Sequence, residues 1–566
     1  MTESVPMPTP RRRGSWGGMS AHLRTLLPSR RDYTGLRRTW RSDLLAGLTV
    51  GIVALPLALG FGASSGLSAE AGLVTAIVAG IVAAVFGGSP VQVSGPTGAM
   101  VVVLVPIVAA HGPSAVVVVT LIAGLLVAAA GVLRLGRAVS YIPWPVIEGF
   151  TLGIAVIIFF QQVPSLMSAT PTPAEAHSAN AIVAAFQAVG GADTGYLPWA
   201  VAVALLVATI MWVAPRIHSA VPGSLIGIVL VTLLVFVAPT PLAVIGTLPG
   251  TLPAPSVPIV DPVVLPQLLV PAVTVAALAA IESLLSARVA ASMADTGTYD
   301  PDRELVGQGL ASLGAAMFGG MPATGAIART AVNVRSGARS RVAAVFHAVV
   351  LLAIVLLASG PVGHIPLAAL AGVLMVTAVR MVHAGTVRAI LSSTRSDAVA
   401  FVVTATITVA FDLIVAVVIG VVLAGIVALR SMSRASGVHR EDLAGDALPG
   451  DERIAVMRFD GPLLFAAADR VFEQMSAVRD VSVVILRMSQ LEVVDATGAR
   501  ILGEIVQLLE RRGVTVLIKG VQPRHEDLFR TVGVLASLRH HRHLFTSLDD
   551  AIAHARSHVR REAASA

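Results

Sequence analysis

Two segments rich in glycine, threonine and proline stand immediately before short apolar runs. One reads Ser-Gly-Pro-Thr-Gly over residues 94–98, and the other reads Thr-Gly-Ala-Ile over residues 324–327. A helix that begins at either segment leaves its first backbone N–H groups without intrahelical partners, and these groups carry partial positive charge. Two such helix starts that face each other within a membrane form a binding site for an anion.

Each of these segments follows a matching stretch of sequence. Phe-Gly-Gly-Ser-Pro at residues 86–90 precedes the first, and Phe-Gly-Gly-Met-Pro at residues 318–322 precedes the second. Paired segments interrupted by glycine and proline are typical of transport proteins built from inverted repeats, whose binding site lies near the bilayer midplane. The alternative is that these glycines only allow close helix packing, as small residues often do in membranes.

A carboxylate within an apolar run offers a second kind of chemistry. Glu282 lies in the run over residues 271–291, and Ser286 follows it at helical spacing. A charged side chain at the bilayer centre costs about 2.5 to 3.5 kcal/mol on insertion scales, so we expect Glu282 to face a polar cavity. It could bind a proton or, together with Ser286, coordinate a coupling cation such as Na⁺. The alternative is a structural hydrogen bond to a neighbouring helix.

Arg329 lies within the first turns of the helix that is predicted to begin at Ile327, where it can supply fixed positive charge. Alternatively, its side chain extends to the cytoplasmic surface or pairs with a carboxylate. The predicted coupling residues are Glu282 and Ser286. The predicted anion-binding residues are Ser94, Gly95, Thr97, Gly98, Thr324, Gly325, Ala326, Ile327 and Arg329.

The elements that must position these residues are membrane-spanning helices. Of the 566 residues, 55% are hydrophobic and 13% are charged, whereas a soluble globular protein has about a quarter of its residues charged. About fourteen apolar runs can span or half-span a bilayer, which predicts two sets of about seven in opposite orientation. These runs begin near Leu44, Ala71, Thr97, Ser114, Val139, Leu197, Ala220, Pro266, Arg303, Ile327, Val342, Pro366, Asp397 and Asp412.

The distribution of arginine predicts the orientation of the chain. Lys and Arg are retained on the cytoplasmic side of a membrane. Here they occur in alternate loops, whereas the long segments 164–196 and 238–265 contain neither. An even number of spans then places both termini in the cytoplasm, for a protein of the plasma or inner membrane. The net charge of +7 is therefore attributed to a cytoplasmic membrane face and not to nucleic-acid binding.

The sequence after Arg430 is that of a soluble domain. Strands are predicted at residues 454–459, 481–488 and 514–519, and helices at residues 466–477 and 498–512, which indicates a small α/β or mixed-sheet domain. The predicted domains are a cytoplasmic arm over 1–42, a transmembrane domain over 43–430, a linker over 431–450, the α/β domain over 451–556 and a flexible basic tail over 557–566.

Several classes of protein are excluded by what the sequence lacks. The chain has no cysteine, which rules out disulfides, thiol catalysis and cysteine-ligated metal. It also lacks the G-x-x-x-x-G-K-[ST] motif of nucleotide-binding loops, so ATP hydrolysis within the chain is not supported. We therefore predict a secondary transporter, not an enzyme, with no metal and no cofactor other than a coupling Na⁺ or H⁺.

Five segments resemble the SulP family of sulfate-permease-type anion transporters. They are DLLAGLTVG at residues 43–51, QVSGPTG at 92–98, IESLL at 281–285, ELVGQG at 304–309 and GGMPATGA at 319–326. The resemblance implies a seven-plus-seven inverted repeat with a core domain and a gate domain, elevator-like movement of the core, and a homodimer in the lipid bilayer.

The resemblance also implies roles for individual residues. In this family the anion lies between the third and tenth helices, which correspond to Thr97 and Gly98 and to Gly325 and Ala326. Glu282 corresponds to an acidic residue that links transport to a cation or a proton. Sodium-coupled members have Asp at this position, so the glutamate favours a proton.

The soluble domain resembles STAS modules through the sequence Asp-Ala-Thr-Gly at residues 495–498. In related free-standing modules the hydroxyl residue of this turn is phosphorylated, which corresponds to Thr497. The alternative is that the Thr497 hydroxyl caps a helix beginning at Gly498. A STAS domain also implies a cytoplasmic regulatory partner.

The predicted substrate is a small inorganic oxyanion, either bicarbonate or sulfate. Residues 55–59 and 94–98 are most similar to the bicarbonate-transporting branch of the family. Three alternatives remain open: a proton-coupled transporter of C4-dicarboxylates, an anion channel of the same fold, and a membrane-anchored signalling protein whose output is the STAS domain.

Overall fold

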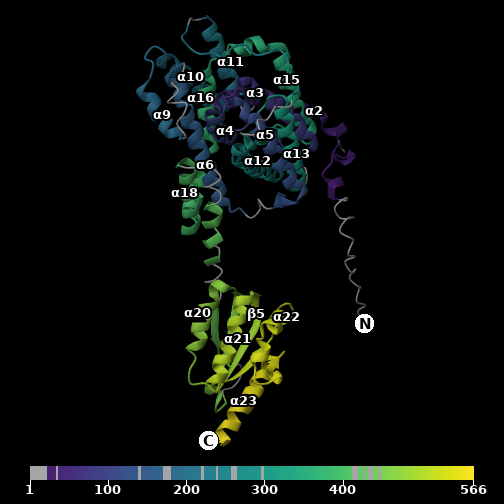
Figure 1. Cartoon of the computed structure of the whole chain (residues 1–566), viewed down its shortest axis with the longest axis vertical. Helices are drawn as coiled ribbons and strands as arrows, with labels where there is room; N and C mark the ends of the chain where they lie inside the picture. Colours follow the sequence, from purple (N-terminus) through teal and green to yellow (C-terminus); the bar gives the residue numbers. More distant parts are fainter. Residues whose placement is uncertain are drawn as a thin grey trace. The chain divides into compact units, whose positions relative to one another are not determined.

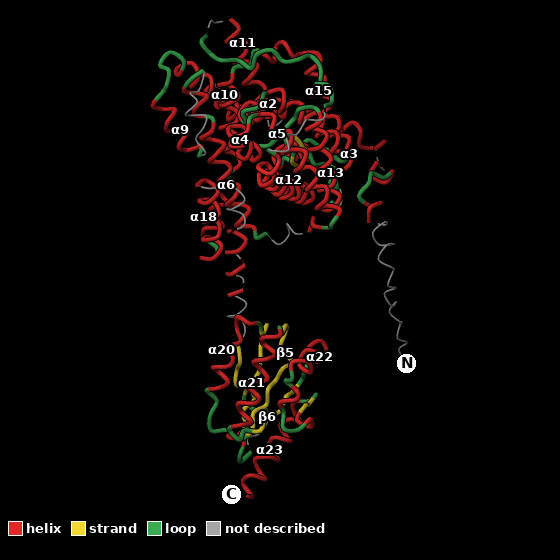
Figure 2. The backbone as a smooth tube through the Cα atoms, viewed as in Figure 1, coloured by secondary structure: helices red, strands yellow, loops and turns green. Residues whose placement is uncertain are grey.

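A computed structural model of the chain describes residues 22–565, with gaps at 34–35, 138–141, 170–179, 218–221, 238–239, 257–263, 295–298, 411–418, 424, 428, 431–436 and 444–447. The chain divides into two compact units, Met1–Val421 and Val422–Ala566. The first unit is helical, and the second contains a sheet flanked by helices (Figures 1 and 2).

The first unit is built from apolar helices, eight of which, within the described residues, are long enough to cross a membrane. A described helix begins close to most predicted starts, but the first helix begins at Leu36, well before the predicted Leu44, and Asp412 lies outside the described residues. The helices are α2 (Leu36–Ser64), α3 (Ala69–Phe86), α4 (Gly98–His111), α5 (Pro113–Val132), α6 (Trp144–Gln161), α7 (Val163–Met167), α9 (Ala181–Gly190), α10 (Leu197–Ile217), α11 (Gly223–Val237), α12 (Leu265–Met293), α13 (Pro301–Met317), α14 (Ile327–Arg335), α15 (Arg341–Gly363), α16 (Leu367–Met381), α17 (Ala384–Leu391) and α18 (Arg395–Ala410).

These helices pack into two groups. In one group, α13 lies against α3 and α5, and α15 lies against α2 and α3. In the other, α18 packs on α6, and α10 packs on α11 and α16. Close approach depends on small residues in places: a Cβ added to Gly124 of α5 would lie 2.9 Å from the carbonyl oxygen of Gly309 in α13. Small residues allow such packing in membranes, where lipid supplies no hydrophobic drive for helices to associate.

The second unit is an α/β domain with a five-stranded sheet in the order β3-β4-β5-β6-β7. Strand β3 is antiparallel to β4, and the remaining pairs are parallel. The strands are β3 (Gly437–Glu441), β4 (Ile454–Leu463), β5 (Val483–Val494), β6 (Thr515–Lys519) and β7 (Leu544–Phe545), and the helices are α20 (Phe465–Ser476), α21 (Ala496–Arg511), α22 (Pro523–Val532) and α23 (Leu548–Ser565).

Alternating residues of the central strands build a core on each face of this sheet. Ala455 and Val484 pack with side chains of α20, α21 and α22, whereas Val456 and Ile485 pack with side chains of α23. This is the period of two that a strand imposes, because successive side chains point to opposite faces. The sheet is therefore covered by helices on both sides.

Two boundaries of this domain differ from those predicted. Strand β3 falls within residues 431–450, which were predicted to be a linker, because a five-residue edge strand gives little hydrophobic signal. The prediction of a flexible tail over residues 557–566 is wrong over most of its length, since α23 continues to Ser565 and buries Val559 against the sheet. Basic residues on the exposed face of α23 hide this amphipathic pattern.

Candidate functional site

The two predicted broken segments meet in the first unit. Strands β1 (Ser94–Gly95) and β2 (Thr324–Gly325) pair antiparallel, with Ser94 opposite Gly325 and Gly95 opposite Thr324. Helices α4 and α14 begin within three residues of these strands, at Gly98 and Ile327. The pairing therefore holds two helix starts together, although they are more than 200 residues apart in the sequence.

Both helix starts lack a side-chain cap. The residues at the N-cap positions, Thr97 of α4 and Ala326 of α14, have extended backbone conformations and make no capping hydrogen bond with a side chain. The first amide groups of a helix need partners from outside the helix, and they favour negative charge. The arrangement can therefore bind an anion through backbone N–H groups from two sides.

Glu282 of α12 joins the two broken segments. Its Oε2 accepts a hydrogen bond from the Thr97 hydroxyl at 2.8 Å and another from the Thr324 hydroxyl at 2.9 Å. The two hydroxyl oxygens are 3.2 Å apart. The Glu282 side chain is partly buried, whereas Thr324 is fully buried. One carboxylate thus contacts the residue before α4 and a residue of β2, so its charge acts on both helix starts.

Ser286, one turn further along α12, is engaged elsewhere. Its hydroxyl lies 3.2 Å from the hydroxyl of Thr330 on α14, and the same Thr330 oxygen accepts a hydrogen bond from the Val93 backbone at 3.0 Å. These contacts tie α12, α14 and the chain before β1 together. In this structure the Ser286 hydroxyl contacts Thr330, and its joint role with Glu282 in a cation site stays a prediction.

Arg329 neither extends to a surface nor forms an ion pair among the described residues. Its side chain is 2% exposed, and Nη2 donates a hydrogen bond to the Pro96 carbonyl at 2.6 Å. Nη1 is buried without a hydrogen-bond partner and would lie 2.8 Å from a Cβ added to Gly95, whose φ is 152°. The guanidinium therefore lies behind β1, where it contributes positive charge through space and fixes the chain that leads into α4.

Ser94 and Gly325 position the strands by contacts of their own. The Ser94 hydroxyl accepts a hydrogen bond from Nε2 of Gln308 at 2.5 Å. The Gly325 amide donates to the Ser283 hydroxyl at 3.1 Å, and a Cβ on Gly325 would collide with the Gln92 side chain. Gln92 in turn donates to the Ser283 carbonyl at 3.3 Å. These residues support the strand pair from behind.

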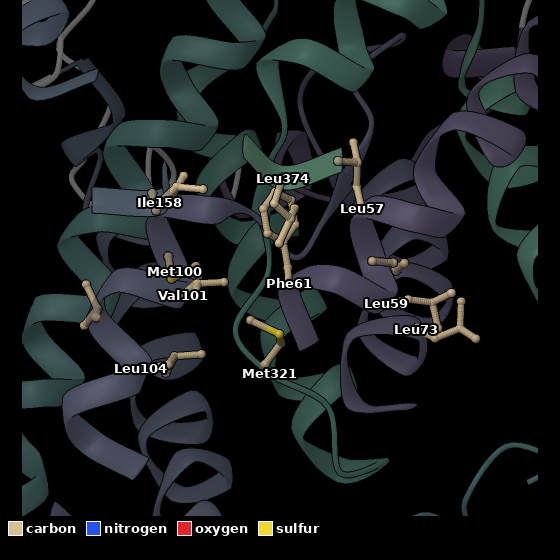
Figure 3. Close-up of a cluster of buried hydrophobic side chains, with 14 of the residues drawn as sticks. Leu57, Leu59, Phe61, Leu73, Met100, Val101, Leu104, Ile158, Met321 and Leu374 are labelled. Carbon is tan, nitrogen blue, oxygen red and sulfur yellow. The ribbon is translucent and has the colours of Figure 1, made fainter. Parts of the chain in front are cut away.

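Apolar side chains close the other side of the α4 start. A Cβ added to Gly98 would collide with Ile158 of α6 and lie 3.3 Å from the ring of Phe61 of α2. Figure 3 shows Phe61 and Ile158 among buried side chains that also include Met100 of α4. The sequence did not single out Phe61 or Ile158 because each lies in an ordinary apolar run. By contrast, Ile327 at the start of α14 is 37% exposed.

The two matching Phe-Gly-Gly stretches are held by side chains from opposite halves of the chain. Oε2 of Glu304 in α13 accepts hydrogen bonds from the backbone of Gly88 at 2.8 Å and of Ser89 at 3.0 Å. The Thr75 hydroxyl in α3 accepts one from the backbone of Met321 at 2.7 Å. The sequence repeat is thus repeated in space, which is the relation expected of an inverted repeat.

In the α/β domain, Thr497 does not cap a helix. Helix α21 begins at Ala496, and its cap is Asp495, whose Oδ1 accepts a hydrogen bond from the Gly498 amide at 2.7 Å. The capping role considered for Thr497 is therefore wrong, because the helix begins two residues earlier than predicted and Asp495 occupies the cap position. Thr497 is partly exposed in the first turn of α21.

A membrane unit with two facing, interrupted helices defines the class of polytopic transporters built from inverted repeats. Residues 40–404 match the model of the sulfate permease family, and residues 447–551 match that of the STAS domain. The chain belongs to the sulfate permease family, whose members are transporters and not enzymes. The family resemblance and the fold class predicted from the sequence are therefore confirmed.

Individual relatives cover most of the chain. It is 33% identical to the putative sulfate transporter YvdB of Bacillus subtilis, over 88% of this chain and 94% of the relative. It is 30% identical to the bicarbonate transporter BicA of Picosynechococcus, over 83% and 87%. The solved transmembrane domain of a cyanobacterial BicA superposes with a TM-score of 0.59 at 31% identity, covering 68% of this chain and 97% of that one. The structure of SLC26A9 shares the fold across 99% of both chains, with a TM-score of 0.80 at 16% identity.

Proposed function

We propose that this protein is a secondary active transporter of a small inorganic oxyanion, either bicarbonate or sulfate. The observation that carries the proposal is the pair of uncapped helix starts held together by β1 and β2. Such a site reads negative charge through backbone N–H groups and suits a small, oxygen-rich anion. The names of the relatives YvdB and BicA support the same two substrates.

The net charge of the site depends on whether Glu282 is protonated, and each protonation state matches one of the two substrates. Each helix start contributes about half a positive charge. With Glu282 ionised, its charge offsets that of Arg329, and the two helix starts leave about one positive charge, which matches bicarbonate. With a proton on Glu282 the site gains one more positive charge and matches the sulfate dianion.

Coupling to a proton follows from the contacts of Glu282. Both threonine hydroxyls donate to Oε2 of the ionised carboxylate. A proton that binds at Oε2 makes this oxygen a donor and displaces at least one of these hydrogen bonds. Proton binding therefore changes the geometry of the segments that lead into α4 and α14. The coupling ion in this proposal is H⁺, and Ser286 instead stabilises the contact between α12 and α14.

Transport requires that the site face the two sides of the membrane in turn. In the proposed elevator-type movement, the helices that carry the site, among them α3, α4, α12, α13 and α14, move as a core. The group that contains α6, α10, α11, α16 and α18 acts as the gate. Packing within each group is more extensive than packing between them, which is greatest where α16 meets α2 and where α4 meets α6, and this difference supports the division. We further propose a homodimer in the plasma or inner membrane, cytoplasmic termini, and regulation through the STAS domain and Thr497.

The test is radiotracer uptake by purified protein in liposomes. Bicarbonate, sulfate and succinate are supplied in turn while pH, sodium and voltage gradients are imposed separately. The proposal predicts accumulation of bicarbonate or sulfate that follows the pH gradient. Flux that follows only voltage and the gradient of the anion itself would identify a channel, and accumulation of succinate alone would identify a dicarboxylate transporter.

A further inference from the structure

Three histidines converge at one edge of the α/β domain. His554 and His558 stand four residues apart on α23 and therefore project from the same face of the helix. His543 comes from the short 3₁₀ helix that leads into β7. Ligand nitrogens from the three rings lie within 4.8 Å of one another. The ring centroids are 4.9 Å apart for His554 and His558, and 5.6 Å from His543 to each of them.

The spacing of the ring nitrogens fits a shared metal ion. Zinc binds histidine nitrogen at about 2.0 to 2.1 Å, so two such ligands of a tetrahedral ion lie about 3.3 Å apart. The Nε2 atoms of His554 and His558 are 3.2 Å apart. A ring nitrogen of His543 lies within 4.8 Å of both. Two histidines one helical turn apart, with a third from another element, form a compact set of ligands.

His543 is prepared for binding because it is buried without a partner for one ring nitrogen. The residue is 4% exposed, and its Nδ1 makes no hydrogen bond of normal geometry with any residue that the structure describes. A buried polar atom of this kind is unusual in a folded protein, and a bound ion would supply the missing partner.

The chemistry of the three ligands favours one class of metal ion. Neutral imidazole suits zinc, copper and nickel, whereas magnesium and calcium prefer oxygen ligands. The cluster contains no carboxylate, so a hard cation has no ligand here.

We propose that His543, His554 and His558 form a binding site for a divalent transition-metal ion, with Zn²⁺ as the best match and a water molecule in the fourth position. The site joins the C-terminal helix to the weakest edge of the sheet. Strand β7 pairs with β6 through only two residues, whereas β3 at the opposite edge pairs through five. A bound ion fixes α23 to β7 and stabilises this edge of the STAS domain.

The test uses the full-length protein in detergent, purified with a tag that contains no histidine. After treatment with a chelator and exposure to Zn²⁺, elemental analysis is expected to find about one Zn²⁺ per chain. Cobalt in place of zinc is expected to give the visible absorption band of a tetrahedral nitrogen site. His554→Gln and His558→Gln are each expected to weaken Zn²⁺ binding by at least about 100-fold, because each removes a direct ligand, whereas loss of a residue that only orients a ligand costs about 10- to 100-fold.

His439→Gln is the matched control because His439 is an exposed histidine on β3, at the opposite edge of the same sheet. This variant is expected to bind Zn²⁺ like the unaltered protein, and Zn²⁺ is expected to raise the unfolding temperature of both. The proposal is overturned if the unaltered protein binds no stoichiometric Zn²⁺ after the chelator step. It is equally overturned if the His554 and His558 variants bind as tightly as the His439 variant. Neither outcome depends on whether the membrane unit transports an anion.

Discussion

The two broken helices share a backbone geometry but differ in their side chains. Helices α4 and α14 both follow a strand of the same antiparallel pair, and both begin without a side-chain cap. The first turn of α4 carries only Gly98, Ala99 and Met100. The first turns of α14 carry Arg329 and Thr330, both fully or almost fully buried.

This difference assigns anion binding to the backbone of the site, and charge and proton chemistry to its side chains. The symmetric backbone supplies N–H groups that bind negative charge without distinguishing strongly between anions. The asymmetric side chains supply charge and proton chemistry: Arg329 lies on α14, and Glu282 reaches Thr97 and Thr324 from α12. The surroundings differ as well, since Gly98 packs against Ile158 while Ile327 is exposed. Substitutions in each part are therefore expected to change different properties of transport.

The largest effect is expected from Glu282→Gln, which removes the proton site that both broken segments share. The amide is similar in size and can still accept the threonine hydroxyl hydrogen bonds, so folding is expected to be nearly unchanged. Accumulation driven by a pH gradient is expected to fall on the order of 100-fold, which corresponds to about 2.7 kcal/mol. Glu148→Gln is the control, because Glu148 accepts a hydrogen bond from Trp144 on α6, outside the site. Equal accumulation by the two variants would remove Glu282 from the coupling mechanism.

A smaller but still large effect is expected from Gly98→Ala at the start of α4. The added methyl group collides with Ile158, and overpacking of this kind costs about 1 to 3 kcal/mol. The half-saturating anion concentration is expected to rise about tenfold. In Gly314→Ala of α13 the new Cβ lies 3.4 Å or more from its neighbours, so uptake is expected to be unaffected. A Gly98→Ala variant with normal affinity would show that the α4 start does not contact the anion.

Substitutions of Arg329 test whether this residue acts through its positive charge or by holding the chain before α4 in place. Arg329→Lys keeps the positive charge but loses the planar guanidinium that bonds the Pro96 carbonyl, whereas Arg329→Met loses both. Anion affinity measured by uptake is expected to fall about tenfold in the methionine variant and only a few-fold in the lysine variant. If both variants lose the same affinity, Arg329 acts by positioning the chain and not by its charge.

The smallest effect on transport is expected from Asp32→Asn, which precedes the first candidate membrane span in the sequence. Arg303 of α13 donates to Asp32 at 2.9 Å and also to the Phe86 carbonyl, so this contact anchors the segment before β1. Uptake is expected to remain near normal, whereas the membrane unit is expected to lose roughly 2 kcal/mol of stability at neutral pH.

The pH dependence of this contact has a definite sign. Burial raises the pKa of Asp32, but hydrogen bonds from Arg303 and Ser29 outweigh it and lower the pKa from 3.8 to about 2. A depressed carboxyl pKa stabilises the fold above the unfolded value of 3.8, and this stabilisation is lost as pH falls toward about 2. Thermal unfolding of the detergent-solubilised protein is expected to show this loss in the unaltered chain and not in Asp32→Asn. Parallel profiles would assign no stability to the ion pair.

Short sequence patterns predicted those parts of the site that are formed by residues adjacent in the sequence. The Gly, Pro and Thr residues before α4 and α14 predicted two interrupted helices, and the repeat of Phe-Gly-Gly predicted that they belong together. The apolar runs and the arginine pattern predicted the helical membrane unit. The sequence also predicted three strands of the α/β domain close to their observed bounds.

The contacts between distant segments could not be predicted in this way. Glu282 and Thr97 are 185 residues apart, and nothing near Glu282 shows that its carboxylate reaches Thr97. The side chain of Ser286 is turned toward Thr330 by the packing of α12 on α14, which helical spacing alone does not reveal. Ser94 was expected to face the anion, but it is held by Gln308 from α13. Which of these contacts form depends on which helices pack against one another in the folded protein.

Protection of a single cysteine tests most directly whether the anion binds at the helix starts. Because the chain has no cysteine, Ile327→Cys places one thiol at the exposed start of α14, and His439→Cys provides an exposed control on β3. Bicarbonate or sulfate is predicted to slow modification of the Ile327 variant by a water-soluble thiol reagent and to leave the His439 variant unchanged. Equal rates at Ile327 with and without saturating anion would contradict the placement of the site.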